Sequence, residues 1–171
     1  LTPWRADRIL VDPFCGSGTF LIEAAMMAAN MAPGMNRSFT AEAWTHVIPK
    51  QLWYDTVEEA QEMVDLDVET DLQGYDLDPD MIKIARANAK QAGVEKLIHF
   101  QQRDVADLKH SKKYGFIITN PPYGERLEEK KNLPALYTTI GEVYRNLDAW
   151  SLYMITSYEE AERYIGRKAD K

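Results

Sequence analysis

Five short apolar runs that alternate with segments of helical periodicity constrain the fold of this chain more than any other feature. The apolar runs lie at 8–11, 72–75, 97–101, 115–119 and 151–156. The helical patterns, in which apolar side chains recur every three or four residues, lie at 19–31, 80–92, 133–147 and 159–165. Strands that alternate with helices pack into a parallel sheet with helices on both faces. The sequence therefore predicts an α/β fold with a doubly wound, mostly parallel sheet.

Residues 32–71 separate the first predicted helix from the second predicted strand. Val57, Ala60, Val64 and Val68 follow a helical pattern, which predicts one or two inserted helices. No internal repeat divides the chain, and 171 residues are enough for one domain with its own core. We therefore assign residues 1–171 to one domain. Because it opens at Leu1 without a methionine, we expect it to be a piece of a longer protein.

Composition excludes several classes of protein. One cysteine rules out a disulfide framework or a cysteine-built zinc site, and the three histidines lie far apart, so we expect no metal. No apolar run reaches the length of a membrane span, and no signal peptide is present, so we expect a cytoplasmic protein. A net charge of −7 argues against a stand-alone nucleic-acid binder. An enzyme that holds nucleic acid through another domain is still compatible with that charge.

A glycine-rich turn follows the first predicted strand. Asp12 ends that strand, and Gly16, Ser17 and Gly18 lead into the next helix. Glycines let the backbone approach a ligand closely, and the helix start offers free amides. The alternative is a tight turn that binds nothing. A dinucleotide fingerprint fits poorly, because Leu21 occupies its third glycine position.

Carboxylates follow the second and third predicted strands. Asp76 ends the second strand, where an acidic residue can hold ribose hydroxyls. Asp78, with Pro79 after it, is typical of a helix N-cap. Asp104 follows the third strand and could accept from an adenine amino group, although a solvated loop position explains it nearly as well. Carboxyl ends of parallel strands meet at one edge, so these carboxylates should lie near the glycine turn.

The fourth predicted strand ends in Asn120-Pro121-Pro122-Tyr123. The prolines have no N–H and stiffen the turn, so its carbonyls are available to a ligand. The Asn120 amide oxygen and the Pro121 carbonyl could accept both hydrogens of a planar amino group. Tyr123 offers a ring on which an unstacked base could lie. This turn therefore predicts a pocket for an exocyclic amine.

These motifs resemble those of the class I S-adenosylmethionine-dependent amino-methyltransferases, which have a Rossmann-like sheet. Three stretches resemble more narrowly the bacterial large-subunit ribosomal RNA guanine 2-amino methyltransferases that carry an RNA-binding THUMP domain. They are DPFCGSGTFLIEAA at 12–25, the segment 74–88, and NPPYGERL at 120–127. Members of that family are often catalogued as adenine-specific DNA methylases. Against this family, the chain lacks the upstream THUMP domain and ends before the terminal antiparallel hairpin, so we expect a domain truncated on both sides.

The resemblance implies a role for each motif. S-adenosyl-L-methionine is the implied cofactor, and RNA, bound through a missing N-terminal domain, is the implied partner. Asn120, Pro121 and Tyr123 are the implied catalytic residues at the target base. The implied cofactor-binding residues are Asp12, Pro13, Cys15, Gly16, Ser17, Gly18, Thr19, Asp76, Leu77, Asp104, Val105 and Asn120.

We therefore predict methyl transfer to an exocyclic amine of a nucleobase, with guanine in 23S ribosomal RNA as the first choice. Positioning of the amine supplies most of the rate, without a covalent nucleophile or a metal. Methylation of an adenine amino group in DNA or RNA, and methylation of a protein glutamine, are alternatives that use the same turn. A cofactor-binding module that only supports a partner is the non-enzymatic alternative, and a nicotinamide dehydrogenase is the most distant one.

Overall fold

Five parallel strands form the centre of the molecule. The computed structural model describes residues 2–35, 37–124 and 127–170, with side chains from residue 130 onward in the last range. The strands are β1 (Leu10–Asp12), β2 (Leu72–Asp76), β3 (Ile98–Gln102), β4 (Phe116–Thr119) and β5 (Ser151–Met154). Their order in the sheet is β3-β2-β1-β4-β5, and each of the four pairings is parallel. The predicted α/β fold with a doubly wound sheet is confirmed.

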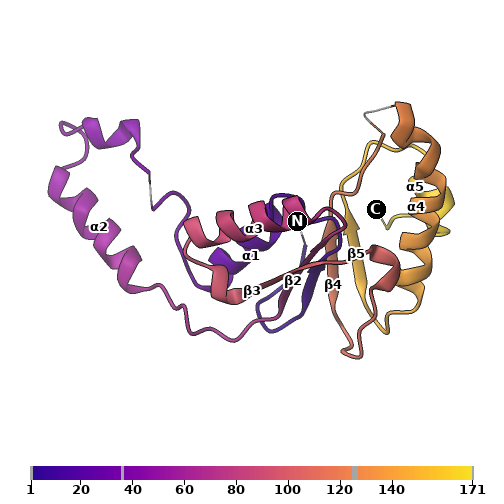
Figure 1. Cartoon of the computed structure of the whole chain (residues 1–171). Helices are drawn as coiled ribbons and strands as arrows, with labels where there is room; N and C mark the ends of the chain where they lie inside the picture. The colour runs from indigo at the N-terminus through magenta and orange to yellow at the C-terminus, as the bar shows by residue number, and fades with distance from the viewer. Residues whose placement is uncertain (1, 36, 125–126, 171) are drawn as a thin grey trace.

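Helices cover both faces of the sheet (Figure 1). Helices α1 (Thr19–Ala28) and α3 (Pro79–Gln91) lie on one face, and α4 (Leu127–Arg145) and α5 (Ala161–Ile165) on the other. Three single turns of 3-10 helix complete the connections: η1 (Thr40–Ala43), η2 (Glu95–Leu97) and η3 (Val105–Asp107). The first face buries Leu10, Leu72 and Phe100 of the strands. The second face buries Val11, Tyr75 and Ile117.

The chain winds outward from β1 in both directions, because β1 lies between β2 and β4. The connections after β1 and β4 therefore leave the sheet toward opposite faces. In an open α/β sheet, this divergence creates a crevice at the carboxyl ends of the strands, and ligands bind there. The glycine turn and the Asn-Pro-Pro-Tyr turn both lie at this edge.

Local sequence signals fix several of the helix ends. The Asp78 carboxylate accepts from the Asp80 amide at 2.8 Å, which caps α3 with Pro79 in its first turn, as predicted. Gly93 follows α3 in the left-handed region, also as predicted. Helix α1 is shorter than the predicted 19–31, because Asn30 has a φ of 54° and interrupts it.

Residues 32–71 form an arm that projects from the sheet and carries α2 (Lys50–Glu62) (Figure 1). The predicted helical pattern through Val64 and Val68 was wrong at its end, because the chain turns back to the body after Met63. There the Asp65 amide donates to the Ala29 carbonyl at 2.9 Å. None of the described residues of the arm is buried. It holds nine of the 27 acidic residues of the chain but only two of the 20 basic ones.

Other predicted boundaries were displaced by a few residues. Helix α4 begins at Leu127 rather than Leu133, so that Pro134 lies inside it. Strand β5 ends at Met154 rather than Thr156. No described helix is both long and apolar enough to cross a membrane.

Candidate active site

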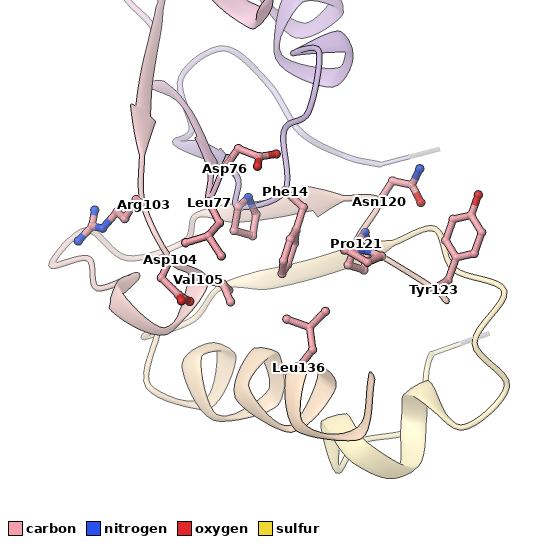
Figure 2. A pocket seen from close by; sticks show the side chains of 12 residues that line it. Phe14, Asp76, Leu77, Arg103, Asp104, Val105, Asn120, Pro121, Tyr123 and Leu136 are labelled. Carbon is pink, nitrogen blue, oxygen red and sulfur yellow. The ribbon is translucent and has the colours of Figure 1, made fainter. Parts of the chain in front are cut away.

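A cavity of about 500 Å³ opens at the carboxyl edge of the sheet, a volume within the usual range for small-molecule sites (Figure 2). Its walls come from the connections after β1, β2, β3 and β4 and from one residue of α4. The predicted site residues that line it are Pro13, Asp76, Leu77, Asp104, Val105, Asn120, Pro121 and Tyr123. Motifs that are up to 110 residues apart in the sequence are therefore brought to one cavity.

The glycine turn after β1 lies beside this cavity rather than in its lining. Of the predicted residues, Asp12, Cys15, Gly16, Ser17, Gly18 and Thr19 are not among the lining residues. The Gly16 amide donates to the Asp76 carboxylate at 3.0 Å, which ties the turn to the end of β2. Gly18 has a φ of +86°, and a Cβ atom there would lie 3.0 Å from the Phe100 ring. A side chain at this position would therefore strain the start of α1.

Asp12 is a buried carboxyl group at the end of β1, with 2% of its surface exposed. The Thr119 hydroxyl donates to its Oδ1 at 2.6 Å, and the Phe14 amide donates to the same oxygen at 3.1 Å. Burial raises the pKa of Asp12 to about 7, against the effect of these two hydrogen bonds, and the Asp76 carboxylate raises it further. The group therefore titrates near neutral pH, where a cationic ligand would favour its ionised form.

Cys15 does not provide a nucleophile. Its side chain is buried in the core cluster beneath α1 and α3. Burial raises the pKa of the Cys15 thiol to about 12, and the negative charges of Asp12 and Asp76 add to this effect. Since a thiolate is the reactive form, this residue is inert at neutral pH.

Backbone amides hold the two carboxylates at one end of the cavity. Asp76 accepts from the Gly16 amide with one oxygen and from the Asp78 amide, at 2.9 Å, with the other. Asp104 caps η3 by accepting from the Ala106 amide at 2.9 Å. Each carboxylate oxygen can accept more than one hydrogen bond, so both groups retain capacity for a ligand.

The Asn-Pro-Pro-Tyr turn forms the other end of the cavity. Asn120 is exposed, Pro121 is buried and Tyr123 is half-buried. Figure 2 shows the Asn120 amide and the Tyr123 ring at this end, with Asp76, Leu77 and Asp104 at the opposite end. The site therefore has an acidic end and an amide end, and Phe14 lies between them.

Four residues that the sequence did not single out as site residues also line the cavity: Phe14, Arg103, Pro122 and Leu136. Phe14 and Pro122 lie inside motifs that were recognised, so their positions could have been included. Arg103 lies over the Tyr75 ring at 5.0 Å and donates to the Asp107 carbonyl at 2.7 Å. No motif marks Arg103 or Leu136. Arg103 directly follows β3 and could have been included with Asp104, whereas Leu136 reaches the cavity through the packing of α4.

The acidic end suits a nucleoside. Asp76 and Asp104 can accept from hydroxyl and amino groups, while Leu77, Val105 and Phe14 offer apolar contacts to a flat ring. Among the residues that the structure describes, no group of three or more His, Cys, Asp or Glu side chains is arranged to hold a metal ion.

The parallel sheet, its strand order and this two-ended site at its carboxyl edge match a class I methyltransferase fold. Residues 1–171 match the family model UPF0020, described as the RMKL-like methyltransferase domain. The chain belongs to this family.

Curated relatives carry related names. The chain is 46% identical over 171 residues to a Bacillus subtilis (strain 168) protein named "Putative RNA methyltransferase YpsC", and the match covers 100% of this chain and 44% of that protein. It is 41% identical over 174 residues to the Ribosomal RNA large subunit methyltransferase K/L of Shewanella baltica (strain OS195), covering 98% of this chain and 24% of that protein. The chain thus spans less than half the length of these relatives.

Solved structures agree with the fold. A possible methylase from Clostridium difficile 630 superposes with a TM-score of 0.94 at 51% identity, covering 100% of this chain and 45% of that one. SMU.472, solved as a complex with SAH, superposes with a TM-score of 0.93 at 43% identity. That match covers 99% of this chain and 45% of SMU.472. A "predicted N6-adenine-specific DNA methylase" from Listeria monocytogenes superposes with a TM-score of 0.92 at 46% identity, covering 100% of this chain and 45% of that one. The expected cofactor, S-adenosylmethionine, is therefore confirmed at the level of the family.

Proposed function

We propose that this chain binds S-adenosylmethionine in the two-ended cavity and methylates an exocyclic amino group of a nucleobase, with guanine in 23S ribosomal RNA as the first choice. The observation that carries the proposal is that the Asn120–Tyr123 turn and the carboxylates Asp76 and Asp104 line one cavity. A donor at the acidic end and an amine at the amide end would share that space.

The acidic end would hold the cofactor. Asp76 would accept from the ribose hydroxyls and Asp104 from the adenine amino group, with Leu77 and Val105 against the ring. The glycine turn from Asp12 would face the methionine part. When bound, S-adenosylmethionine supplies an electrophilic methyl group on a positively charged sulfur.

The amide end would hold the target. The Asn120 side-chain oxygen and the Pro121 carbonyl would each accept one N–H of the amine, which orients the nitrogen lone pair. Tyr123 would stack on the base after it has left its helix, as bases must for chemistry at an amino group. The rate would come mainly from this positioning, which can contribute about 7–11 kcal/mol when reacting groups are well aligned.

Two curated relatives support RNA as the substrate class, since their names refer to RNA or ribosomal RNA methylation. A domain outside these residues would bind the RNA. The relatives are more than twice as long as this chain, which is enough for such a domain. Ribosomal RNA as substrate would place the reaction in the cytoplasm. The Listeria structure's name supports the alternative of an adenine amino group, which presents the same two N–H donors.

Calorimetric titration of this chain with S-adenosylmethionine, and in parallel with NAD, tests the cofactor. We expect saturable binding of S-adenosylmethionine alone; binding of NAD alone would overturn the proposal.

The full-length gene product is then incubated with labelled S-adenosylmethionine and unmodified 23S ribosomal RNA, and the digested nucleosides are separated by mass. Methyl-guanosine is the expected product. Methyl-adenosine as the product, or label on a protein glutamine, would instead support the corresponding alternative, adenine or glutamine methylation.

A further inference from the structure

The turn that would receive the amine has few ways to be held in place. Pro121 and Pro122 have no N–H, so hydrogen bonds can hold the middle of the turn only through its carbonyls. The last ladder bond beside it is the Ile155 amide to the Thr119 carbonyl at 3.0 Å. Beyond that bond the chain leaves the sheet and depends on contacts from other elements.

Tyr137 of α4 supplies such a contact. Its side chain is completely buried, and its hydroxyl lies 3.2 Å from the Pro122 carbonyl and 2.6 Å from the Thr156 hydroxyl. The preceding residue, Leu136, lines the cavity, whereas Tyr137 is not among the lining residues. Tyr137 therefore supports the turn from behind and does not face the ligand space.

The hydrogen bonds around Tyr137 form a chain with one direction. The Pro122 carbonyl can only accept, so Tyr137 uses its one hydrogen there and must accept from the Thr156 hydroxyl. The Thr156 oxygen in turn accepts from the Tyr158 amide at 3.1 Å. A hydroxyl has only one hydrogen to donate, and this arrangement uses each one once. The Tyr158 ring also meets the Tyr137 ring edge-on, with centroids 4.9 Å apart.

We propose that Tyr137 and Thr156 are positioning residues, whose hydroxyl chain fixes the Pro122 carbonyl and thereby the geometry at which Asn120 and Tyr123 meet the target amine. The inference rests on the proposed function in so far as the turn receives that amine. Burial raises the pKa of the Tyr137 hydroxyl, which keeps it protonated as a donor.

The same helix offers a matched control. Tyr144 also donates its hydroxyl to a backbone carbonyl, that of Trp150, at 3.1 Å. Trp150 precedes β5, at the opposite edge of the sheet from the cavity. Tyr144→Phe therefore removes the same group and the same kind of bond from α4 without touching the turn.

The experiment compares Tyr137→Phe, Thr156→Val, Thr156→Ser and Tyr144→Phe with the wild type. Hydrogen exchange of the Tyr123 and Gly124 amides is measured by NMR on this chain, and cofactor binding by calorimetry. Turnover on unmodified 23S ribosomal RNA is measured with the full-length gene product. In Tyr137→Phe and Thr156→Val, these amides should exchange faster and turnover should fall by about tenfold, because the Pro122 carbonyl loses the hydroxyl chain that holds it. Cofactor affinity should not change, and Thr156→Ser should restore both values.

Unchanged exchange at Tyr123 and Gly124 in both Tyr137→Phe and Thr156→Val would overturn the inference. So would an equal effect of Tyr144→Phe, or faster exchange without any loss of turnover. If Tyr137→Phe fails to fold, the Thr156 pair decides the question alone. Absence of methyl transfer by the wild type would refute the proposed function, and the exchange measurement would still test whether the hydroxyl chain holds the turn.

Discussion

The two ends of the cavity are built in different ways. At the acidic end, Asp76 and Asp104 are held by backbone amides of the turns that directly follow the strands. At the amide end, the prolines donate nothing, and the turn is held from outside by Tyr137 of α4. The acidic end is thus supported by the sheet, whereas the amide end depends on how a helix packs. Substitutions at the first should change cofactor affinity, and those at the second should change the rate of transfer.

The largest effect should follow from Asn120→Ala. This change removes an acceptor for the target amine but leaves the acidic end intact, so methyl transfer should fall by at least about 100-fold, the penalty that misplacing a reacting group can carry. Cofactor affinity measured by calorimetry should be nearly unchanged. Single-turnover transfer to RNA at saturating cofactor measures the loss.

Asn146→Ala is the matched control for this change. Asn146 is an exposed amide just after α4 and is not among the cavity residues. The Asn146→Ala variant should transfer methyl groups at the same rate as the wild type. An equal loss of cofactor affinity and of transfer in Asn120→Ala would contradict the division of the cavity into two ends.

A smaller effect, at the other end, is expected from Asp76→Ala. The variant loses the carboxylate that would hold the ribose, together with its bonds from the Gly16 and Asp78 amides. Hydrogen bonds to a charged group are worth about 1.5–3 kcal/mol, so the Kd for S-adenosylmethionine should rise by about 100-fold at most. Transfer at saturating cofactor should fall much less.

Asp80→Ala controls for loss of a carboxylate in the same segment. Asp80 is exposed, pairs with Lys83 at 2.8 Å and does not line the cavity. The Kd of the Asp80→Ala variant for S-adenosylmethionine should match that of the wild type. A loss of transfer without weaker cofactor binding in Asp76→Ala would remove this residue from the cofactor site.

The same contrast explains what could be predicted from the sequence. The strands and α3 follow from local signals: buried apolar runs, and Asp78 with Pro79 at a helix start. The arrangement of the motifs follows from one rule, that parallel strands bring their carboxyl ends to one edge. Asp76 and Asn120 could therefore be assigned to one site before any distance was known.

What could not be predicted depends on contacts between distant segments. The arm was expected to stay helical through Val68, but the Asp65 amide bonds to the Ala29 carbonyl and the helix ends first. Tyr137 has the spacing of an ordinary core residue, and its bond to Pro122 arises only when α4 packs on the sheet. Residues that act from behind a motif carry no motif of their own.

Asp12→Asn should give the smallest of these three effects and tests the charge of the carboxyl group beside the acidic end. Thr119 and Phe14 both donate to Oδ1, so an asparagine with its oxygen in that position keeps both bonds and removes only the charge. The pKa of Asp12 is raised from 3.8 to about 7 in the folded protein, so folding takes up a proton in this range. The contribution of Asp12 to stability therefore falls as the pH rises from about 4 to about 7.

Two pH series check this prediction. Without cofactor, Asp12→Asn should unfold at a higher temperature than the wild type at pH 8, and the difference should vanish near pH 4. Cofactor binding should show the opposite preference, because a cationic ligand stabilises the ionised carboxylate. The wild-type Kd should tighten as the pH rises through about 7, while the variant should show no such change and bind about tenfold more weakly at pH 8, equivalent to one pKa unit of coupling. If Kd depends on pH in the same way for the two proteins, the charge of the Asp12 carboxylate does not act on the cofactor. Asp76 would then define the acidic end.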